Sequence, residues 1–121
     1  MTSLRTVEHE DVLVVYFTDV KILDDARIQQ VGSELNEMAS QAVGGRMLLN
    51  FQGVQFMSSA MIGKLVLLNK KCKQDKIQLK MCGITSNVAE VFKIMRLNKV
   101  FDIYKDEEKA LKAFNKKGWF S

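Results

Sequence analysis

The chain has no proline, a single histidine and only two cysteines among its 121 residues. A structural zinc site needs four nitrogen or sulfur ligands, and His9, Cys72 and Cys82 supply three at most, so such a site is excluded. Two cysteines cannot frame a disulfide-rich secreted scaffold, and we interpret them as buried, reduced side chains. We expect no metal and no other cofactor.

Long hydrophobic runs are also missing. The longest cover residues 12–17 and 60–68, far short of the about 20 residues that span a bilayer. The first residues lack the apolar stretch of a secretory signal. We therefore expect a cytoplasmic protein that does not act at a membrane.

The excess of positive charge is small. Lysines and arginines number 18 and aspartates and glutamates 14, which gives a formal net charge of +4. Acids are interleaved with the cations, a distribution that does not favour direct binding of nucleic acid. Because the chain contains no linker and no repeat, we predict one domain over residues 1–121.

Extended and helical patterns alternate along the chain. Segments at 4–7, 12–17, 46–51, 77–81 and 101–104 predict strands, and the segment 77–81 alternates as a strand with one exposed face does. Helical periodicity predicts four helices, near residues 25–42, 58–74, 86–95 and 106–116. The second helix is apolar nearly all round and is expected to be buried on more than one side. This order predicts an α/β fold with a mixed sheet of four to five strands and about four helices.

No set of residues has the spacing of a known catalytic motif. A nucleophile elbow needs Gly-x-Ser-x-Gly and a histidine base, and Ser58 and Ser59 lack both flanking glycines. Gly63-Lys64 is not followed by the hydroxyl residue of a phosphate-binding loop. A phosphorelay receiver needs an aspartate at the end of its third strand, where this chain has Asn50. We therefore predict that the protein is not an enzyme.

Ser58 and Ser59 stand where the second helix is predicted to begin. The first amides of a helix lack partners within the helix and carry partial positive charge. A serine oxygen can cap these amides, and a phosphate on a serine would meet the same amides while adding about −1.5 to −2 charge. Position alone favours capping, and regulation by phosphorylation is the alternative.

The segment 48–63, Leu-Leu-Asn-Phe-Gln-Gly-Val-Gln-Phe-Met-Ser-Ser-Ala-Met-Ile-Gly, resembles the signature of the STAS domain in bacterial anti-sigma factor antagonists. The segment 22–24, Ile-Leu-Asp, resembles the entry to the first helix of that family. Residues 81–101 resemble its late strand and helix. The resemblance implies a STAS-like domain.

In that family, a serine at a helix N-terminus is phosphorylated by a partner that is both a serine kinase and an anti-sigma factor. The unmodified form binds this partner and frees the sigma factor, and a serine phosphatase resets the cycle. The resemblance assigns Ser59 as the acceptor, with Ser58 as the alternative. Met57 and Met61 flank the serines and are expected to form an apolar docking rim. The expected partner-binding residues are Asp24, Asp25, Met57, Ser58, Ser59 and Met61.

Two positions depart from the family pattern. Met61 stands where glycine is usual, which predicts bulk beside the acceptor, and Asn50 stands where aspartate is common. Both departures favour an alternative function, that of a STAS scaffold without phosphorylation or of a signalling module that binds a nucleotide or another small ligand.

Overall fold

The computed structural model describes residues 4–42 and 45–119. Its elements follow in the order β1 (Leu4–His9), β2 (Val12–Phe17), β3 (Lys21–Ile22), α1 (Asp25–Gln41), β4 (Arg46–Asn50), β5 (Phe56–Met57), α2 (Ser59–Gln74), β6 (Gln78–Cys82), α3 (Ser86–Ile94), β7 (Ile103–Tyr104) and α4 (Glu107–Trp119).

Five strands form the central sheet in the order β1-β2-β4-β6-β7. β1 runs antiparallel to β2, and the other neighbours are parallel, as expected for strands joined by helical crossovers. The prediction of an α/β domain with a mixed sheet and four helices is confirmed. β3 and β5 form a second, parallel pair, which the sequence did not predict because two residues are too few to show a period.

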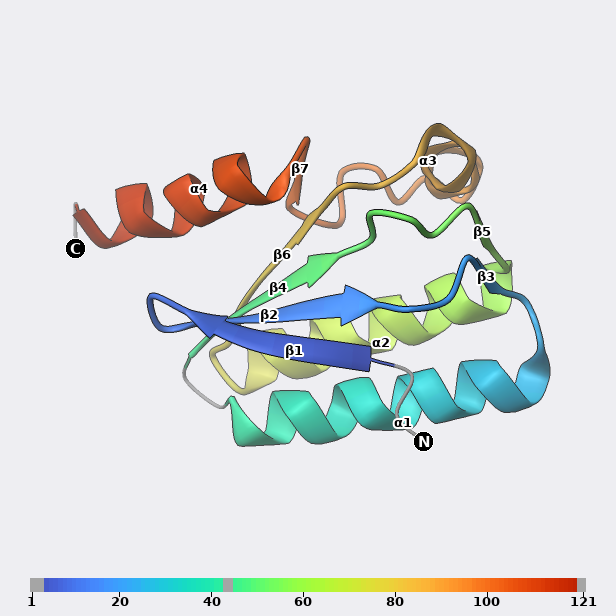
Figure 1. The fold of residues 1–121 in the computed structure, drawn as a ribbon, viewed down its shortest axis with the longest axis horizontal. Coiled ribbons are helices and arrows are strands. Elements are labelled where there is room, and N and C mark those ends of the chain that lie inside the picture. The colour runs from blue at the N-terminus through green and yellow to red at the C-terminus, as the bar shows by residue number, and fades with distance from the viewer. Residues whose placement is uncertain (1–3, 43–44, 120–121) are drawn as a thin grey trace.

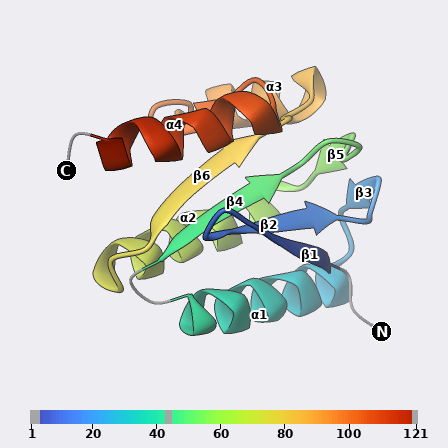
Figure 2. The same cartoon turned by 60° about the vertical axis from the view of Figure 1, so that its left-hand side comes forward.

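One face of the sheet packs against three helices. Figures 1 and 2 show α1 and α2 running along this face, and α3 contributes Val88 and Phe92 to the same core. Leu35 of α1 and Leu65 of α2 are buried there. The rings of Phe17 and Phe51 stack with their centres 4.4 Å apart. This core is built from apolar side chains that meet between sheet and helices.

α1 and α2 approach each other closely at Gly32. A Cβ atom at this position would lie 3.2 Å from Cδ of Lys64, so the glycine leaves room for the lysine stem. The Lys64 ammonium continues across the helix pair and donates to Oε1 of Gln29 at 3.0 Å. The two helices are therefore joined by a side chain that lies along their contact.

The opposite face of the sheet is covered by α4 (Figure 2). Ala110 and Phe114 of this helix pack on Val14, Leu48 and Cys82. This contact corrects the expectation that one face of β6 is exposed, since Lys80 is only 5% exposed.

The buried ammonium of Lys80 has several partners on this face. It bonds the carboxylate of Asp102 and lies 5.1 Å from the ring centres of both Tyr104 and Phe114. Burial opposes the charged form of Lys80, but its bonds to Asp102 and Tyr104 outweigh that effect and raise its pKa. The ammonium of Lys80 is tolerated in this buried layer because its hydrogen-bond partners, Asp102 and Tyr104, lie within the fold.

The end of the first strand is also corrected. The first strand does not end at residue 7 but continues to His9, and the turn consists of Glu10 and Asp11 with φ of 50° and 68°. Two left-handed residues are typical of the tightest hairpin turns. α2 packs against both α1 and the sheet, as expected for a helix buried on more than one side, and only its outer side is open, where Leu67 is 58% exposed. No helix in the described part of the chain has the length and apolar character that crossing a bilayer requires.

Candidate functional site at the N-terminus of α2

Two neighbouring serines play different parts where α2 begins. Ser58 is the N-cap: its backbone is extended (φ −75°, ψ 160°), and its Oγ accepts a hydrogen bond from the amide of Met61 at 3.3 Å. Ser59 is the first helical residue and is exposed. The capping function expected from position therefore belongs to Ser58, which leaves the hydroxyl of Ser59 accessible from solvent.

The expected docking rim of Met57 and Met61 is corrected by the structure. Met57 is 4% exposed and Met61 is 0% exposed, and both belong to the core between the sheet and α1–α3. Met61 projects inward because α2 turns this side of its first turn toward the sheet. Its bulk therefore lies in the core rather than on the surface beside Ser59.

Other apolar side chains are exposed at this end of the molecule. Leu23 is 52% exposed, Val20 55% and Phe56 46%. The ammonium of Lys21 lies 5.6 Å from the ring centre of Phe56, across the β3–β5 pair. A partner that covered these side chains would remove apolar surface from water, which is favourable.

The β3–β5 pair joins the starts of α1 and α2. The amide of Ser58 donates to the carbonyl of Ile22 at 3.1 Å, and the amide of Gln55 donates to the carbonyl of Val20 at 2.8 Å. Asp24 then caps α1 by accepting from the amide of Arg27 at 3.2 Å. Figures 1 and 2 show both helices starting at the same end of the molecule, beside β3 and β5. We call residues 20–25 and 55–59 the β3–β5 corner; it contains Asp24, Asp25, Ser58 and Ser59.

An ion pair holds the chain that leads into this corner. Arg27 donates to Asp19 through Nε at 2.8 Å and through a terminal nitrogen at 2.7 Å, a two-pronged geometry. These hydrogen bonds hold the pKa of Asp19 below its ordinary value. The pair connects the end of β2 to the first turn of α1, and so it positions β3 between them.

Asn50 is 5% exposed and belongs to a polar cluster under α4. Its Nδ2 donates to Oε1 of Glu107 at 3.1 Å, and its Oδ1 accepts from the amide of Gln52 at 2.9 Å. The hydroxyl of Tyr16 donates to the same Glu107 oxygen at 2.6 Å. This bond, together with burial, raises the pKa of Tyr16 to about 12. An amide suits position 50 because it donates to Glu107, whereas an aspartate would face a second carboxylate.

The two cysteines and the histidine lie outside the β3–β5 corner. Cys72 and Cys82 are buried, as predicted, and burial raises the pKa of the Cys72 thiol to about 11 and that of Cys82 to about 12, which disfavours reactive thiolates. His9 lies at the exposed end of β1. In the described residues, no three His, Cys, Asp or Glu side chains gather as they would around a metal ion.

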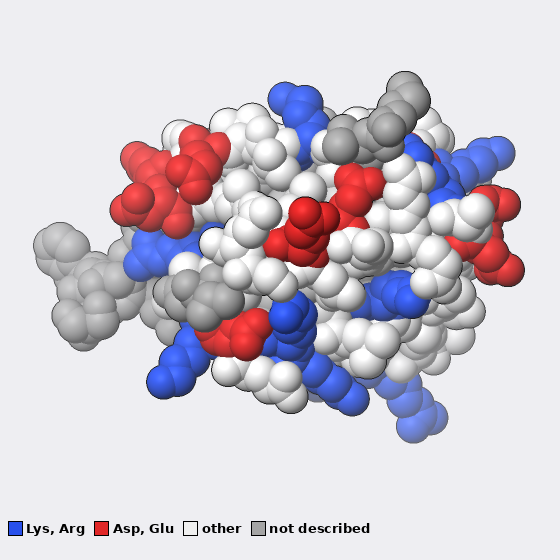
Figure 3. All heavy atoms as spheres, turned by 90° about the horizontal axis from the view of Figure 1, so that it is seen from below, with Lys and Arg blue, Asp and Glu red and all other residues white. Residues whose placement is uncertain are grey.

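Charges of both signs occupy the surface on the α1 side. Figure 3, which views the molecule from below, shows acidic side chains between the lysines and arginines. The described residues of that face form no continuous basic stripe of the kind that tracks a nucleic-acid backbone. The expectation of no direct nucleic-acid binding stays a prediction.

Comparison with known proteins identifies the domain. A family model described as the STAS domain matches residues 3–110. The chain belongs to the STAS domain family. No curated protein sequence matches it.

Several solved structures share the fold of this STAS domain. An anti-sigma-factor antagonist (STAS) domain protein from Planctomyces limnophilus superposes with a TM-score of 0.81 at 24% identity, over 93% of this chain and 98% of that one. RsbS from Moorella thermoacetica, with a serine-to-glutamate substitution, gives 0.80 at 14% identity over 97% and 98%. The anti-sigma factor antagonist SpoIIAA in its unphosphorylated form gives 0.72 at 16% identity over 93% and 96%.

Among apolar side chains, the prediction for this STAS domain thus named the buried Met57 and Met61 and missed the exposed Leu23 and Phe56. Phe56 and Met57 are adjacent in a strand, and adjacent strand residues point to opposite sides, so only one of them can be on the surface. Met57 pairs in register with Ile22, whereas Phe56 pairs with Lys21. Lys21, the residue opposite Phe56, therefore indicates that Phe56 rather than Met57 is on the surface. The sequence alone does not reveal this, because the β3–β5 pairing must be known first.

Proposed function

We propose that this protein is an anti-sigma factor antagonist. It binds an anti-sigma factor that is also a serine kinase, through the β3–β5 corner, and thereby frees the sigma factor. Phosphorylation of Ser59 ends the binding, and a serine phosphatase restores it. The observation that carries the proposal is the exposed position of Ser59 at the start of α2, beside a serine that already caps the helix.

The structural relatives agree with such a cycle. SpoIIAA, described as a Bacillus cell fate determinant, has also been solved in a phosphorylated form, which has this fold with a TM-score of 0.67. The RsbS structure carries a glutamate in place of a serine, a substitution that introduces negative charge. These relatives support a phosphorylated serine as the regulated group.

A phosphate on Ser59 can act without unfolding the domain. It adds about −1.5 to −2 charge beside the first amides of α2, where an anion is stabilised. The Ser58 cap and the buried Met61 are untouched by it. At an interface, the same group is bulky and charged, and each hydrogen bond left unpaired there costs about 1–3 kcal/mol. Since micromolar binding corresponds to about 8 kcal/mol, a few such losses suffice for release.

The protein is then a substrate of catalysis rather than an enzyme, and it works where its partners are, in the cytoplasm. Leu23 and Phe56 supply the apolar contact area, because they are exposed at the corner whereas Met57 and Met61 are buried.

The direct test is phosphorylation in vitro. The full chain is incubated with purified serine-kinase anti-sigma factors and Mg-ATP, and the modified residue is mapped by mass spectrometry. We expect one phosphate, on Ser59. Absence of any phosphate with a kinase that binds the protein would contradict the switch, and stabilisation by nucleotide in the same sample would favour the ligand-binding alternative.

Variants separate the two serines. Ser59→Ala should bind the kinase and resist labelling, whereas Ser59→Asp should weaken binding at least tenfold. Ser58→Ala should lower the free energy of unfolding by about 1 kcal/mol through loss of the cap and still be labelled at Ser59. Ser33→Asp, which adds the same charge to an exposed serine of α1, is the control and should bind normally. Equal binding by Ser59→Asp and the control would show that charge at Ser59 does not release the partner.

A further inference from the structure

β7 is the last strand of the central sheet and pairs with β6 alone. The amide of Met81 donates to the carbonyl of Asp102 at 2.9 Å, and Met81 is in register with Ile103. In a parallel pair, a residue bonds to the neighbours of the residue opposite, so the amide and carbonyl of Ile103 point to the outer edge. Among the described residues, no strand pairs with that edge. An edge of this kind can accept another strand.

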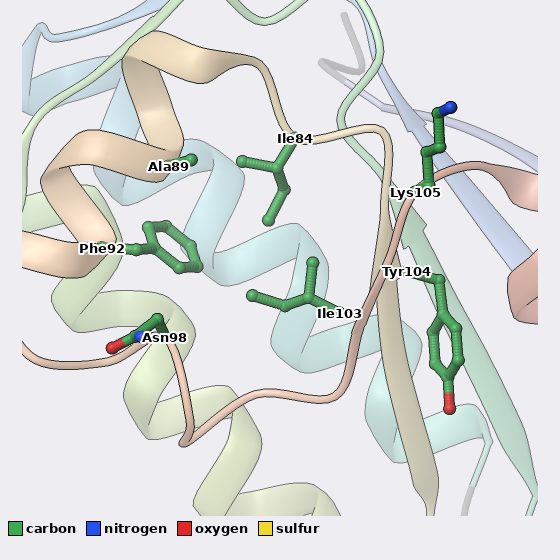
Figure 4. A pocket seen from close by; sticks show the side chains of 7 residues that line it. All are labelled: Ile84, Ala89, Phe92, Asn98, Ile103, Tyr104 and Lys105. Carbon is green, nitrogen blue, oxygen red and sulfur yellow. The ribbon is translucent and has the colours of Figure 1, made fainter.

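An apolar hollow of about 280 Å³ lies on the α3 side of β7. Figure 4 shows Ile84, Ala89, Phe92 and Ile103 pointing into one space, while Tyr104 and Lys105 point away from it. The hollow is slightly smaller than the about 300–1,000 Å³ of pockets that hold drug-sized molecules, so it suits an apolar side chain.

A second hollow lies on the α4 side of the same strand. It has a volume of about 420 Å³ and is lined by Tyr104 with Lys109, Lys112 and Ala113 of α4. Successive side chains of a strand point to opposite faces. A strand added beside β7 would therefore present alternate residues to the two hollows, which is the usual way in which strand addition gains specificity.

Lysines are the charged residues that line the two hollows, namely Lys105, Lys109 and Lys112. The nearby acids each have a partner: Asp102 bonds Lys80, and Asp106 accepts from the amide of Lys109 at 2.9 Å. Glu108 pairs with Lys112 at 3.2 Å on the exposed side of α4.

The loop that leads to β7 adds to this charge. Lys93, Arg96 and Lys99 are exposed, and residues 91–101 contain no acid. A segment that pairs with the edge thus meets lysines on both sides of the strand and a basic loop beside it. The excess of cations, which comes mainly from this loop, favours an acidic segment.

We propose that the outer edge of β7 binds an extended, acidic segment of a partner protein. The segment pairs with the amide and carbonyl of Ile103 and places an apolar side chain among Ile84, Ala89, Phe92 and Ile103. Its carboxylates lie near Lys105, Lys109 and Lys112. The site contains neither Ser58 nor Ser59, so it stands independently of the phosphorylation cycle and offers a second partner a place on the domain.

The test uses the full chain and an array of seven-residue peptides in which apolar residues alternate with acids, with lysines or with serines. We expect the acidic alternating peptides to bind best and to lose affinity as salt is raised. In nuclear magnetic resonance spectra, the largest amide shifts should fall on residues 102–105, and exchange of the Ile103 amide should slow. Equal binding of lysine peptides, absence of binding by any peptide, or shifts elsewhere would overturn the proposal.

Variants confirm the location. Ala89→Glu places a carboxylate in the wall of the first hollow and should weaken binding at least tenfold. The control is Ala26→Glu, at an exposed alanine of α1, which should bind as the original chain does. If Ala89→Glu unfolds, Lys112→Glu on the exposed side of α4 replaces it and should weaken binding at least threefold. Anionic phosphatidylglycerol vesicles that gave the same shifts while the acidic peptides gave none would assign the edge to a membrane and overturn the proposal.

Discussion

The two faces of the central sheet hold their helices in different ways. The face toward α1, α2 and α3 meets them through apolar side chains such as Leu35, Leu65 and Phe92. The face under α4 also buries Asn50 and Lys80, each bonded to a side chain that follows β6 in sequence. The stabilisation gained by burying apolar surface is non-directional and proportional to the buried area. A buried polar group, in contrast, is tolerated only where it meets a hydrogen-bond partner. The first face therefore supplies most of the stability, and the second fixes where α4 lies.

The largest effect should come from the apolar face. Leu65→Ala removes a fully buried side chain of α2 and should lower the free energy of unfolding by about 2–5 kcal/mol in urea. Leu67→Ala, two residues further along the same helix but 58% exposed, should change it by no more than about 0.5 kcal/mol. Similar losses for the two variants would contradict the assignment of the stabilising face.

On the face under α4, the free energy of unfolding should depend on the charge of the buried polar side chains rather than on their volume. Asn50→Asp removes the donor to Glu107 and sets two carboxylates against each other, so we expect a loss of about 2–3 kcal/mol at pH 7. The loss should shrink as the pH falls, because the repulsion raises the pKa of one carboxyl and that group takes up a proton. Adding Glu107→Gln should restore most of the stability at pH 7. If it does not, the two positions are not coupled.

Changes to the ion pair between Lys80 and Asp102 should have a smaller effect on the free energy of unfolding, and the effect should depend on which partner is replaced. Asp102→Asn leaves the Lys80 ammonium without its carboxylate and should cost about 1–2 kcal/mol. Lys80→Met keeps the aliphatic stem, removes the charge and should fall within about 1 kcal/mol of the original chain. Urea unfolding of both variants checks the order. A greater loss for Lys80→Met would mean that the ion pair itself stabilises the fold.

The smallest effect is spectroscopic. The pKa of Tyr16 is raised to about 12, against an ordinary value of 10.0, first by its hydrogen bond to Glu107 and then by burial. The protonated phenol thus stabilises the folded protein fully below about pH 10, and this contribution is lost as the pH rises toward 12. Absorbance at high pH should show one of the two tyrosines titrating near 12. Glu107→Gln should lower that value, and Tyr16→Phe should remove the transition.

The sequence predicted the features that repeat along the chain. The helical spacing of Val31 and Leu35, and the apolar runs of β2 and β4, place the main elements within a few residues. These patterns are local, because a helix or strand that packs on a core must show its period in its own sequence. The position of Ser58 and Ser59 at the start of α2 follows from the same reasoning and is correct.

The features that the sequence did not predict depend on contacts between distant segments. The alternation of β6 is typical of a half-exposed strand, and only the later packing of α4 covers Lys80. Met57 and Met61 lie beside the serines in sequence, and only the β3–β5 pairing and the orientation of α2 show that they point inward. Which serine caps the helix depends on where its first turn begins, a boundary that patterns give only to within a few residues.

Gly32 lies far from the corner and still bears on its shape. Because this residue has no side chain, the axes of α1 and α2 can run near each other with only the stem of Lys64 between them. A bulky residue at position 32 would push the two helices apart. The distance between their starts, with Asp24 at one and Ser59 at the other, would then increase. The dimensions of a surface that a partner must match are thus set halfway along two helices, at a residue that is itself buried.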